Sequence, residues 1–306
     1  MTKLKYLFKV TLFLFATFII MQSCDKEDDR IEEEKVKLQE YLEENNYSDI
    51  EPTSSGLYYI VVTESDGDSP QSSDYVNIRF TGSLIDGTVF ETSDRDLAER
   101  EGIVREDKLY GPAKFSLENI GIAGLREGLM LMNEGGESKI IMPSNLAFGG
   151  TDYGIIPPYS TLIYDVELLD VISDPAEHEQ QLLNAYIEEN ELTGIEPTSS
   201  GLYYIEQEAG TGDLPLEDDI VSVHYVGRLL DGRVFDQSES DNPLVVNMSS
   251  TNVIPGFIEG LSKMRENGKA MIIVPWELGY GSDGSSEGII PPYSTLVYDL
   301  EVVDIE

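Results

Sequence analysis

An internal duplication constrains this 306-residue sequence more than any other feature. The segment 51–60, EPTSSGLYYI, recurs letter for letter at 196–205, shifted by 145 residues. Two more pairs follow in the same order: Gly82–Phe90 with Gly227–Phe235, and Ile155–Leu162 with Ile289–Leu296. Repeats of this length indicate two copies of one domain, so a single large fold is excluded.

The two copies differ mainly by one insertion. The shift falls from 145 residues at the first matches to 132 residues between Gly124 and Gly256. The first copy therefore carries 13 extra residues between Phe90 and Gly124. The extra residues fall in the region of the charged stretch Leu97–Tyr110, which we expect to be a surface loop.

Each copy has the sequence pattern of a sheet with one short helix. Apolar residues alternate with polar ones at 76–80 and 221–225, as in a half-buried strand. Asp-Gly pairs at 86–87 and 231–232 predict hairpin turns. In 124–132 and 256–264 apolar residues recur three and four apart, which predicts a short helix. The fold class is therefore α+β, with an antiparallel sheet curled around one helix in each copy.

Charged helical segments precede both copies. Ile31–Glu44 places its apolar residues roughly on one side, and Asp174-Pro175 can begin a helix that continues with an apolar stripe. We expect a tether to the membrane and a linker between the domains. The predicted organisation is 1–23 leader, 24–51 acidic tether and helix, 52–172 first domain, 173–196 helical linker and 197–306 second domain.

The N-terminus has the pattern of an export signal. Lysines at positions 3, 5 and 9 precede an uncharged apolar run, Val10–Met21, which is too short for a standard spanning helix. The following Ser23-Cys24 resembles the lipobox of bacterial lipoproteins, and the acidic tract at 25–29 resembles that of Bacteroidetes surface lipoproteins. This resemblance implies cleavage before Cys24, acylation of Cys24, and anchoring to the outer membrane. Whether the chain faces the periplasm or the cell surface stays open.

Composition excludes several functions. The chain holds 58 acidic and 20 basic residues, a net charge of −38, which repels phosphate backbones and argues against nucleic-acid binding. With one cysteine and two histidines, an internal disulfide and a Cys/His metal cluster are both impossible. We expect no metal and no cofactor.

The ordered motifs of the second copy resemble the FKBP family of peptidyl-prolyl cis/trans isomerases. They are VHYVG at 223–227, DGRVFD at 231–236, VIPGF at 253–257, GYG at 279–281 and GIIPPYSTLVYD at 288–299. The resemblance extends over nearly all of both copies. It implies two tandem FKBP-like domains, each a five- or six-stranded antiparallel sheet around a short helix.

The same resemblance implies a substrate pocket in the second copy. Phe257 would form its floor, where many family members have tryptophan, Tyr280 would donate to a substrate carbonyl, and Asp236 would be the carboxylate of the pocket wall. The remaining lining residues would be Tyr225, Phe235, Val253, Ile254, Ile289, Ile290 and Tyr298.

The first copy departs from this pattern at the positions expected to act on substrate. Phe80 replaces the strand tyrosine, Glu91 the aspartate, Leu125 the aromatic floor and Phe148 the hydroxyl donor. The cavity stays apolar through Phe90, Phe115, Ile122, Ile155, Ile156 and Tyr164. We expect this copy to be weakly active or inactive, and to bind peptides.

Prolyl isomerisation suits a chain with few conventional catalytic groups. Rotation about an X–Pro bond crosses a barrier of about 20 kcal/mol because amide resonance is lost in the twisted state. No bond is made or broken, so no nucleophile or metal is required, and an apolar pocket with a few donors suffices.

We therefore expect an isomerase that assists the folding of exported or envelope proteins, with proline-containing polypeptides as substrates. Two alternatives stay open. Both copies could bind proline-containing segments without useful turnover, or the chain could be a scaffold subunit of a gliding or secretion assembly with envelope protein partners.

Overall fold

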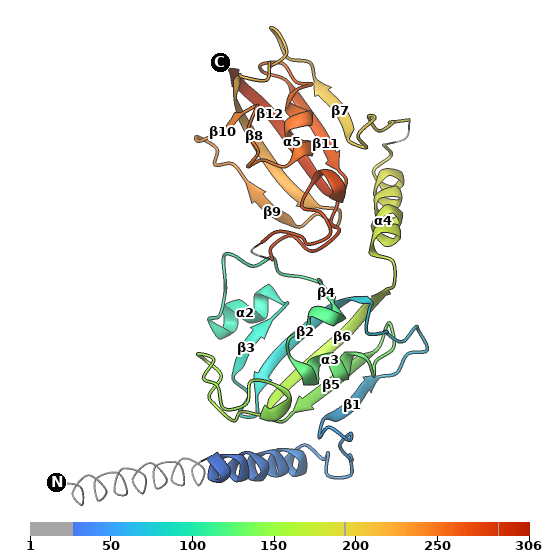
Figure 1. Cartoon of the computed structure of the whole chain (residues 1–306), viewed down its shortest axis with the longest axis vertical. Coiled ribbons are helices and arrows are strands. Elements are labelled where there is room, and N and C mark those ends of the chain that lie inside the picture. The colour runs from blue at the N-terminus through green and yellow to red at the C-terminus, as the bar shows by residue number, and fades with distance from the viewer. Residues whose placement is uncertain (1–26, 193, 287) are drawn as a thin grey trace, which may run out of the picture. The chain divides into compact units, whose positions relative to one another are not determined.

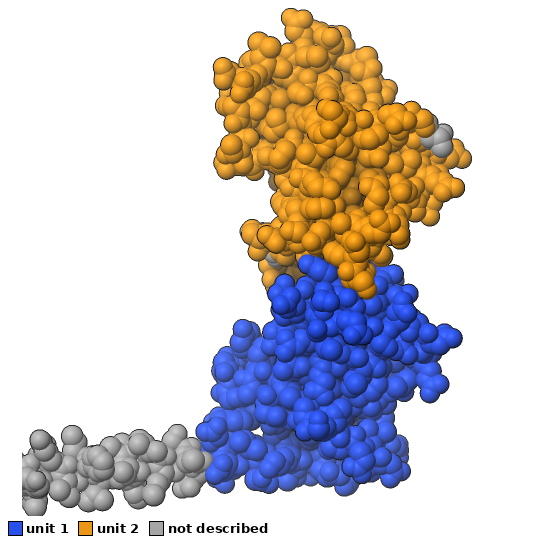
Figure 2. All heavy atoms as spheres, turned by 45° about the vertical axis from the view of Figure 1, so that its right-hand side comes forward, with its two compact units in different colours: residues 1–104, 116–171 blue, residues 105–115, 172–306 orange. Residues whose placement is uncertain are grey.

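The computed structural model describes residues 27–192, 194–286 and 288–306 (Figure 1). Cys24 and the expected leader lie outside the described residues. The chain divides into two compact units (Figure 2). The first comprises the described residues up to Val104 together with Ser116–Val171, and the second comprises Arg105–Phe115 with Ile172–Glu306.

The first unit is built on a sheet with the strand order β1-β5-β6-β2-β3, and the residues Ala113–Phe115 of β4 group with the second unit. The strands are β1 (Tyr58–Thr63), β2 (Tyr75–Leu84), β3 (Val89–Thr92), β4 (Ala113–Ser116), β5 (Glu137–Met142) and β6 (Leu162–Ile172). Val76, Ile78 and Phe80 of β2 are buried, because every second side chain of a strand points to the same face. The predicted turn follows β2, where Gly87 has a φ of 88°.

The second unit repeats this topology. Its sheet has the order β10-β8-β12-β11-β7, with β9 paired to β8. All of these neighbouring strands run antiparallel to each other. The strands are β7 (Tyr203–Glu208), β8 (Ile220–Leu229), β9 (Val234–Gln237), β10 (Leu244–Asn247), β11 (Lys269–Val274) and β12 (Leu296–Ile305).

A short helix lies on the inner face of each sheet, at α3 (Ala123–Leu129) and α5 (Pro255–Leu261). Glycines allow the close approach: a Cβ on Gly128 would lie 2.5 Å from Ile140, and one on Gly256 would lie 2.4 Å from Val274. Three further turns are 3-10 helical, at η1 (Leu117–Asn119), η2 (Ser144–Leu146) and η3 (Trp276–Leu278). The first unit also holds α2 (Arg95–Glu101), capped by Asp94 and ended by Gly102 with a φ of 69°.

A longer helix covers the outer face of each sheet. Residues 27–44 are helical, and Leu38 and Leu42 pack with Ile141 and Ile163. Ile141 and Ile140 are neighbours on β5, so their side chains point to opposite faces of the sheet. The helix therefore lies on the face opposite α3.

The helix α4 (Pro175–Glu189) repeats this arrangement in the second unit. Its Leu183 packs with Ile273 and Val297, while the neighbouring Ile272 faces α5. The side chain of Asp174 caps α4 by accepting from the N–H groups of Ala176 and Glu177, as its sequence predicts. Both helices thus belong to the packing of their sheets, beyond the tether and linker roles expected from the sequence. No helix within the described residues combines the length and the apolar character needed to cross a membrane.

Candidate functional site

The second unit holds a box of four aromatic side chains contributed by β8, β9, α5 and β12. Phe257, on α5, is 3% exposed and forms its floor. Its ring meets Tyr225 edge-on at 5.7 Å between centroids, and meets Tyr298 at 5.1 Å. Phe235 closes the box, also edge-on to Tyr298, at 5.6 Å. Edge-to-face geometry is favourable for rings at these separations, so the box is a rigid apolar surface.

A carboxylate and a hydroxyl are paired at the edge of this box. The hydroxyl of Tyr225 donates to Oδ2 of Asp236 at 2.5 Å. Burial raises the pKa of Tyr225, and the hydrogen bond to Asp236 and its negative charge raise this pKa further. Tyr225 is therefore a fixed neutral donor to Asp236, and it holds the carboxylate against the wall.

Two further tyrosine hydroxyls are left for a ligand. Burial raises the pKa of Tyr280, and the charge of Asp236 raises it further, so Tyr280 stands close to this carboxylate. The pKa of Tyr298 is raised by burial first, then by Tyr280, Tyr225 and Asp236.

Within the described residues, neither hydroxyl has a hydrogen-bond partner in the protein. No fully buried side-chain polar atom there lacks a partner, so both hydroxyl oxygens are reached from solvent even though Tyr298 is 4% exposed. The box therefore presents free donors next to an apolar floor.

The remaining predicted lining residues surround the box. Val253 and Ile254 are partly buried and pack on the core cluster that contains Phe257 and Tyr298, and Ile290 is buried within this cluster. Ile289, its neighbour on the loop, is half-buried. Val253, Ile254 and Ile290 thus share a core cluster with Phe257 and Tyr298, and Ile289 adjoins Ile290 in the chain.

The corresponding site of the first unit uses its groups differently. Phe80 and Phe90 pack against the ring of Tyr164 at 6.2 Å and 5.7 Å. The hydroxyl of Tyr164 donates to Glu91, and burial, followed by the charge of Glu91, raises the pKa of Tyr164. Because Phe80 has no hydroxyl, Tyr164 takes the place that Tyr225 has in the second unit. The first cavity is left without the free hydroxyl that Tyr298 provides.

The other first-copy residues predicted for the pocket are apolar and differ in burial, and Phe115 on β4 is exposed. Leu125 and Ile156 are buried, Ile122 is half-buried at the start of α3, and Ile155 is exposed. Phe148 stacks on Tyr153 at 4.4 Å and offers no donor. Sequence reasoning assigned Tyr164 and Tyr298 to the lining and missed their different hydroxyl roles. The signal lies on another strand, where the first copy has Phe80 and the second copy has Tyr225.

Comparison with known proteins agrees with this geometry. The family described as FKBP-type peptidyl-prolyl cis-trans isomerase matches residues 67–169 and 212–303, most of the chain. The chain belongs to this family. The expected class, α+β with two tandem FKBP-like domains, is therefore confirmed.

Individual FKBP-type relatives match parts of the chain. The isomerase FkpA of Escherichia coli K12 is 42% identical over 114 residues, which are 37% of this chain and 41% of that protein. Human FKBP10 is 31% identical over 236 residues, 76% of this chain and 34% of that protein. The crystal structure of E. coli FkpA shares 33% identity and a TM-score of 0.39, covering 54% of this chain and 71% of that one. The chain thus spans less than half the length of these two curated relatives.

The described residues contain no group of three or more His, Cys, Asp or Glu side chains that could hold a metal ion.

Proposed function

We propose that this chain catalyses the cis/trans isomerisation of X–Pro bonds in the pocket of its second unit. The observation that carries the proposal is the pairing of an aromatic floor, Phe257, with the free hydroxyls of Tyr280 and Tyr298. Membership of the FKBP-type family supports the reaction, and the pocket supplies groups that suit it.

The chemistry follows from the charge distribution of the amide. A planar amide is more polar than the twisted one, because twisting removes the resonance that places charge on oxygen and nitrogen. An apolar box around the prolyl ring disfavours the planar form relative to the twisted form. A hydroxyl of Tyr280 or Tyr298 holds the peptide carbonyl, so that binding energy is used in the transition state.

We propose that the sites act as follows: Tyr225, Phe235, Val253, Ile254, Phe257, Ile289, Ile290 and Tyr298 line the active pocket, with Asp236 and Tyr280 at its edge. The first unit keeps an apolar cavity but uses its Tyr164 hydroxyl on Glu91. This observation supports a second role for the first unit, that of binding proline-containing peptides with little turnover.

The location and substrates of the chain are part of the proposal. Cleavage before Cys24 and acylation of its thiol would anchor the chain to the outer membrane, and its substrates would be proline-containing exported or envelope polypeptides. Labelling cells with palmitate tests the anchor: the wild-type chain should incorporate the label and the Cys24→Ala variant should not. Incorporation into Cys24→Ala would contradict the assignment.

Prolyl exchange by the purified full chain on a short X–Pro peptide tests the activity. Phe257→Leu gives the second floor the residue that the first copy has, so we expect kcat/KM to fall about tenfold. Leu125→Met, a volume-conserving change at the equivalent position of the first unit, is the matched control and should leave kcat/KM unchanged. A folded wild-type chain without acceleration, or equal losses in both variants, would refute the assignment.

A further inference from the structure

A segment of the first copy that ends on β4 belongs to the second unit. The segment Arg105–Phe115 groups with Ile172–Glu306 (Figure 2). Leu109 packs on the core cluster of this unit, which contains Phe257, Ile290 and Tyr298. The charged stretch expected to be a surface loop therefore contributes an apolar side chain to the packing of the second unit.

The backbone of the segment is held by an arginine next to the pocket. Nη1 of Arg233 donates to the carbonyls of Tyr110 and Pro112, at 3.3 Å and 2.8 Å. Arg233 lies two residues before Phe235, so the segment is attached beside the aromatic box. Gly111, with a φ of 110°, permits the approach, since a Cβ there would lie 2.9 Å from Cδ of Arg233.

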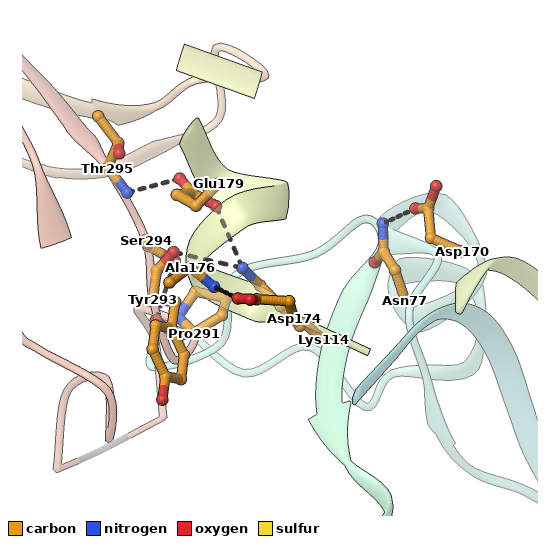
Figure 3. A network of polar contacts seen from close by, with 10 residues as sticks. All are labelled: Asn77, Lys114, Asp170, Asp174, Ala176, Glu179, Pro291, Tyr293, Ser294 and Thr295. Atoms are coloured by element: carbon orange, nitrogen blue, oxygen red, sulfur yellow. Dashed lines mark hydrogen bonds and ion pairs between the residues drawn. The ribbon is translucent and has the colours of Figure 1, made fainter. Parts of the chain in front are cut away.

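A buried ion pair ties the end of the segment to α4 (Figure 3). Nζ of Lys114 lies 3.2 Å from Oε2 of Glu179, and these side chains are 11% and 6% exposed. Lys114 also donates to the carbonyl of Tyr293 at 3.4 Å, and Oε1 of Glu179 accepts from the N–H of Thr295 at 2.6 Å. The pair thus holds two points of the 288–295 loop, which carries Ile290.

The first unit shows which hydrogen-bond donors surround the equivalent buried carboxylate. Glu34, shifted by 145 residues from Glu179, is also a buried carboxylate on the outer helix. It accepts from the N–H and the hydroxyl of Ser144, both at 2.6 Å, and from the hydroxyl of Thr161 at 2.9 Å.

In the second copy the residue at the place of Ser144 is Trp276, each being the first residue of a 3-10 helix after a proline. A tryptophan has no hydroxyl to donate to Glu179. A buried carboxylate is costly without donors, and Lys114 provides the missing one.

We propose that Lys114 is a positioning residue of the second pocket: it fixes the 288–295 loop, and with it the affinity for peptide. The inference rests on the proposed isomerase function. The loop needs such support because Tyr293 has a φ of 53°, which a non-glycine residue adopts only when its surroundings hold it. Its ring lies 4.9 Å from that of Trp276, and its N–H donates to Gly281.

The test uses the full chain and the double variant Lys114→Met/Glu179→Gln. Removing both charges leaves no buried carboxylate unpaired, and the amide oxygen introduced at position 179 can still accept from Thr295. We expect KM for an X–Pro peptide to rise about fivefold with kcat within about twofold of wild type, since Tyr280 and Asp236 are untouched. The single variant Lys114→Arg keeps the positive charge and should have the KM of wild type. Lys139→Met, which breaks the Lys139–Asp165 pair of the first unit, should also leave KM unchanged.

Trp276 provides a readout that does not depend on catalysis. It is the one tryptophan of the sequence and contacts the loop through Tyr293, so its emission and its quenching by acrylamide report the loop in the native state. In the double variant we expect shifted emission and stronger quenching. If wild type proves inactive, the proposed function fails while Trp276 still tests the loop. Unchanged emission and quenching, or an unchanged KM in an active chain, would overturn the role of Lys114.

Discussion

Tyr280→Phe removes one oxygen atom from the second pocket and tests the role of its hydroxyl. Tyr280 is 38% exposed, and its hydroxyl has no hydrogen-bond partner within the described residues. The change therefore leaves no protein group unpaired, and the free energy of unfolding should stay within about 0.5 kcal/mol of wild type. A neutral hydrogen bond contributes about 0.5–1.5 kcal/mol net, so its loss from the transition state lowers kcat/KM by a factor of about 2 to 12.

The assay compares kcat/KM for prolyl exchange on a short X–Pro peptide with the urea midpoint of the same preparation. Tyr153→Phe is the matched control. Tyr153 is 60% exposed and stacks on Phe148, and Phe148 is the first-unit residue that corresponds to Tyr280. It should change neither quantity. Unchanged kcat/KM in Tyr280→Phe would show that the hydroxyl makes no contact specific to the transition state. A stability loss above about 1 kcal/mol would show that it is bonded within the protein.

Three further outcomes are expected from the structure. Glu34→Ala leaves the donors of Ser144 and Thr161 unpaired, so urea unfolding should show a loss of about 2–4 kcal/mol in the first unit; an unchanged midpoint would make the carboxylate dispensable. Gly111→Ala should reduce the stability of the second unit by about 1–2 kcal/mol and so lower its thermal midpoint, since Gly111 has a φ of 110° and a Cβ there would meet Arg233. Equal thermal midpoints in the two chains would contradict this. Burial raises the pKa of Tyr164 and Tyr225 above the ordinary value of 10.0, so the folded chain keeps protons that the unfolded chain loses. Stability should therefore be constant up to about pH 9 and fall as the pH rises through 10, which unfolding curves measured at pH 8 to 11 would check.

Local patterns predict most of the sheet architecture. The alternation at 76–80 and 221–225 and the Asp-Gly turns depend on neighbouring residues, and they predict β2, β8 and the hairpins that follow them. The three-and-four spacing places α3 and α5 within a few residues of their observed ends. These features are encoded over short stretches, where periodicity is informative.

Contacts between distant residues explain what the sequence analysis did not predict. The outer helices pack on the sheets through Leu38 and Leu183. These two leucines are 145 residues apart, and so are Glu34 and Glu179, which is the shift between the two copies. Extending the repeat upstream of residue 51 would have indicated that the helices belong to the copied unit. The contact of Lys114 with Glu179 had no such signal, because the residue at the place of Lys114 in the second copy is Val245, on β10, which carries no charge.

The composition of the pocket was easier to predict than its hydrogen bonding. Tyrosine occurs at positions 164 and 298, and both were assigned to the lining. Which hydroxyl bonds the carboxylate is decided by another strand, where the first copy has Phe80 and the second has Tyr225. A single substitution on one strand therefore changes the hydrogen bonding of a tyrosine on another.

The second unit includes Arg105–Phe115 from the first copy, whereas the first unit includes no residue from the second copy. The first unit includes no residue beyond Val171, and its Glu34 is satisfied by its own Ser144 and Thr161. In the second unit Glu179 is paired with Lys114, which precedes the strands β7 to β12 in the chain. Because synthesis runs from the N-terminus, the lysine is present whenever the second unit emerges. The order of the two copies along the chain thus suits vectorial folding, and a chain with the copies exchanged would lack this advantage.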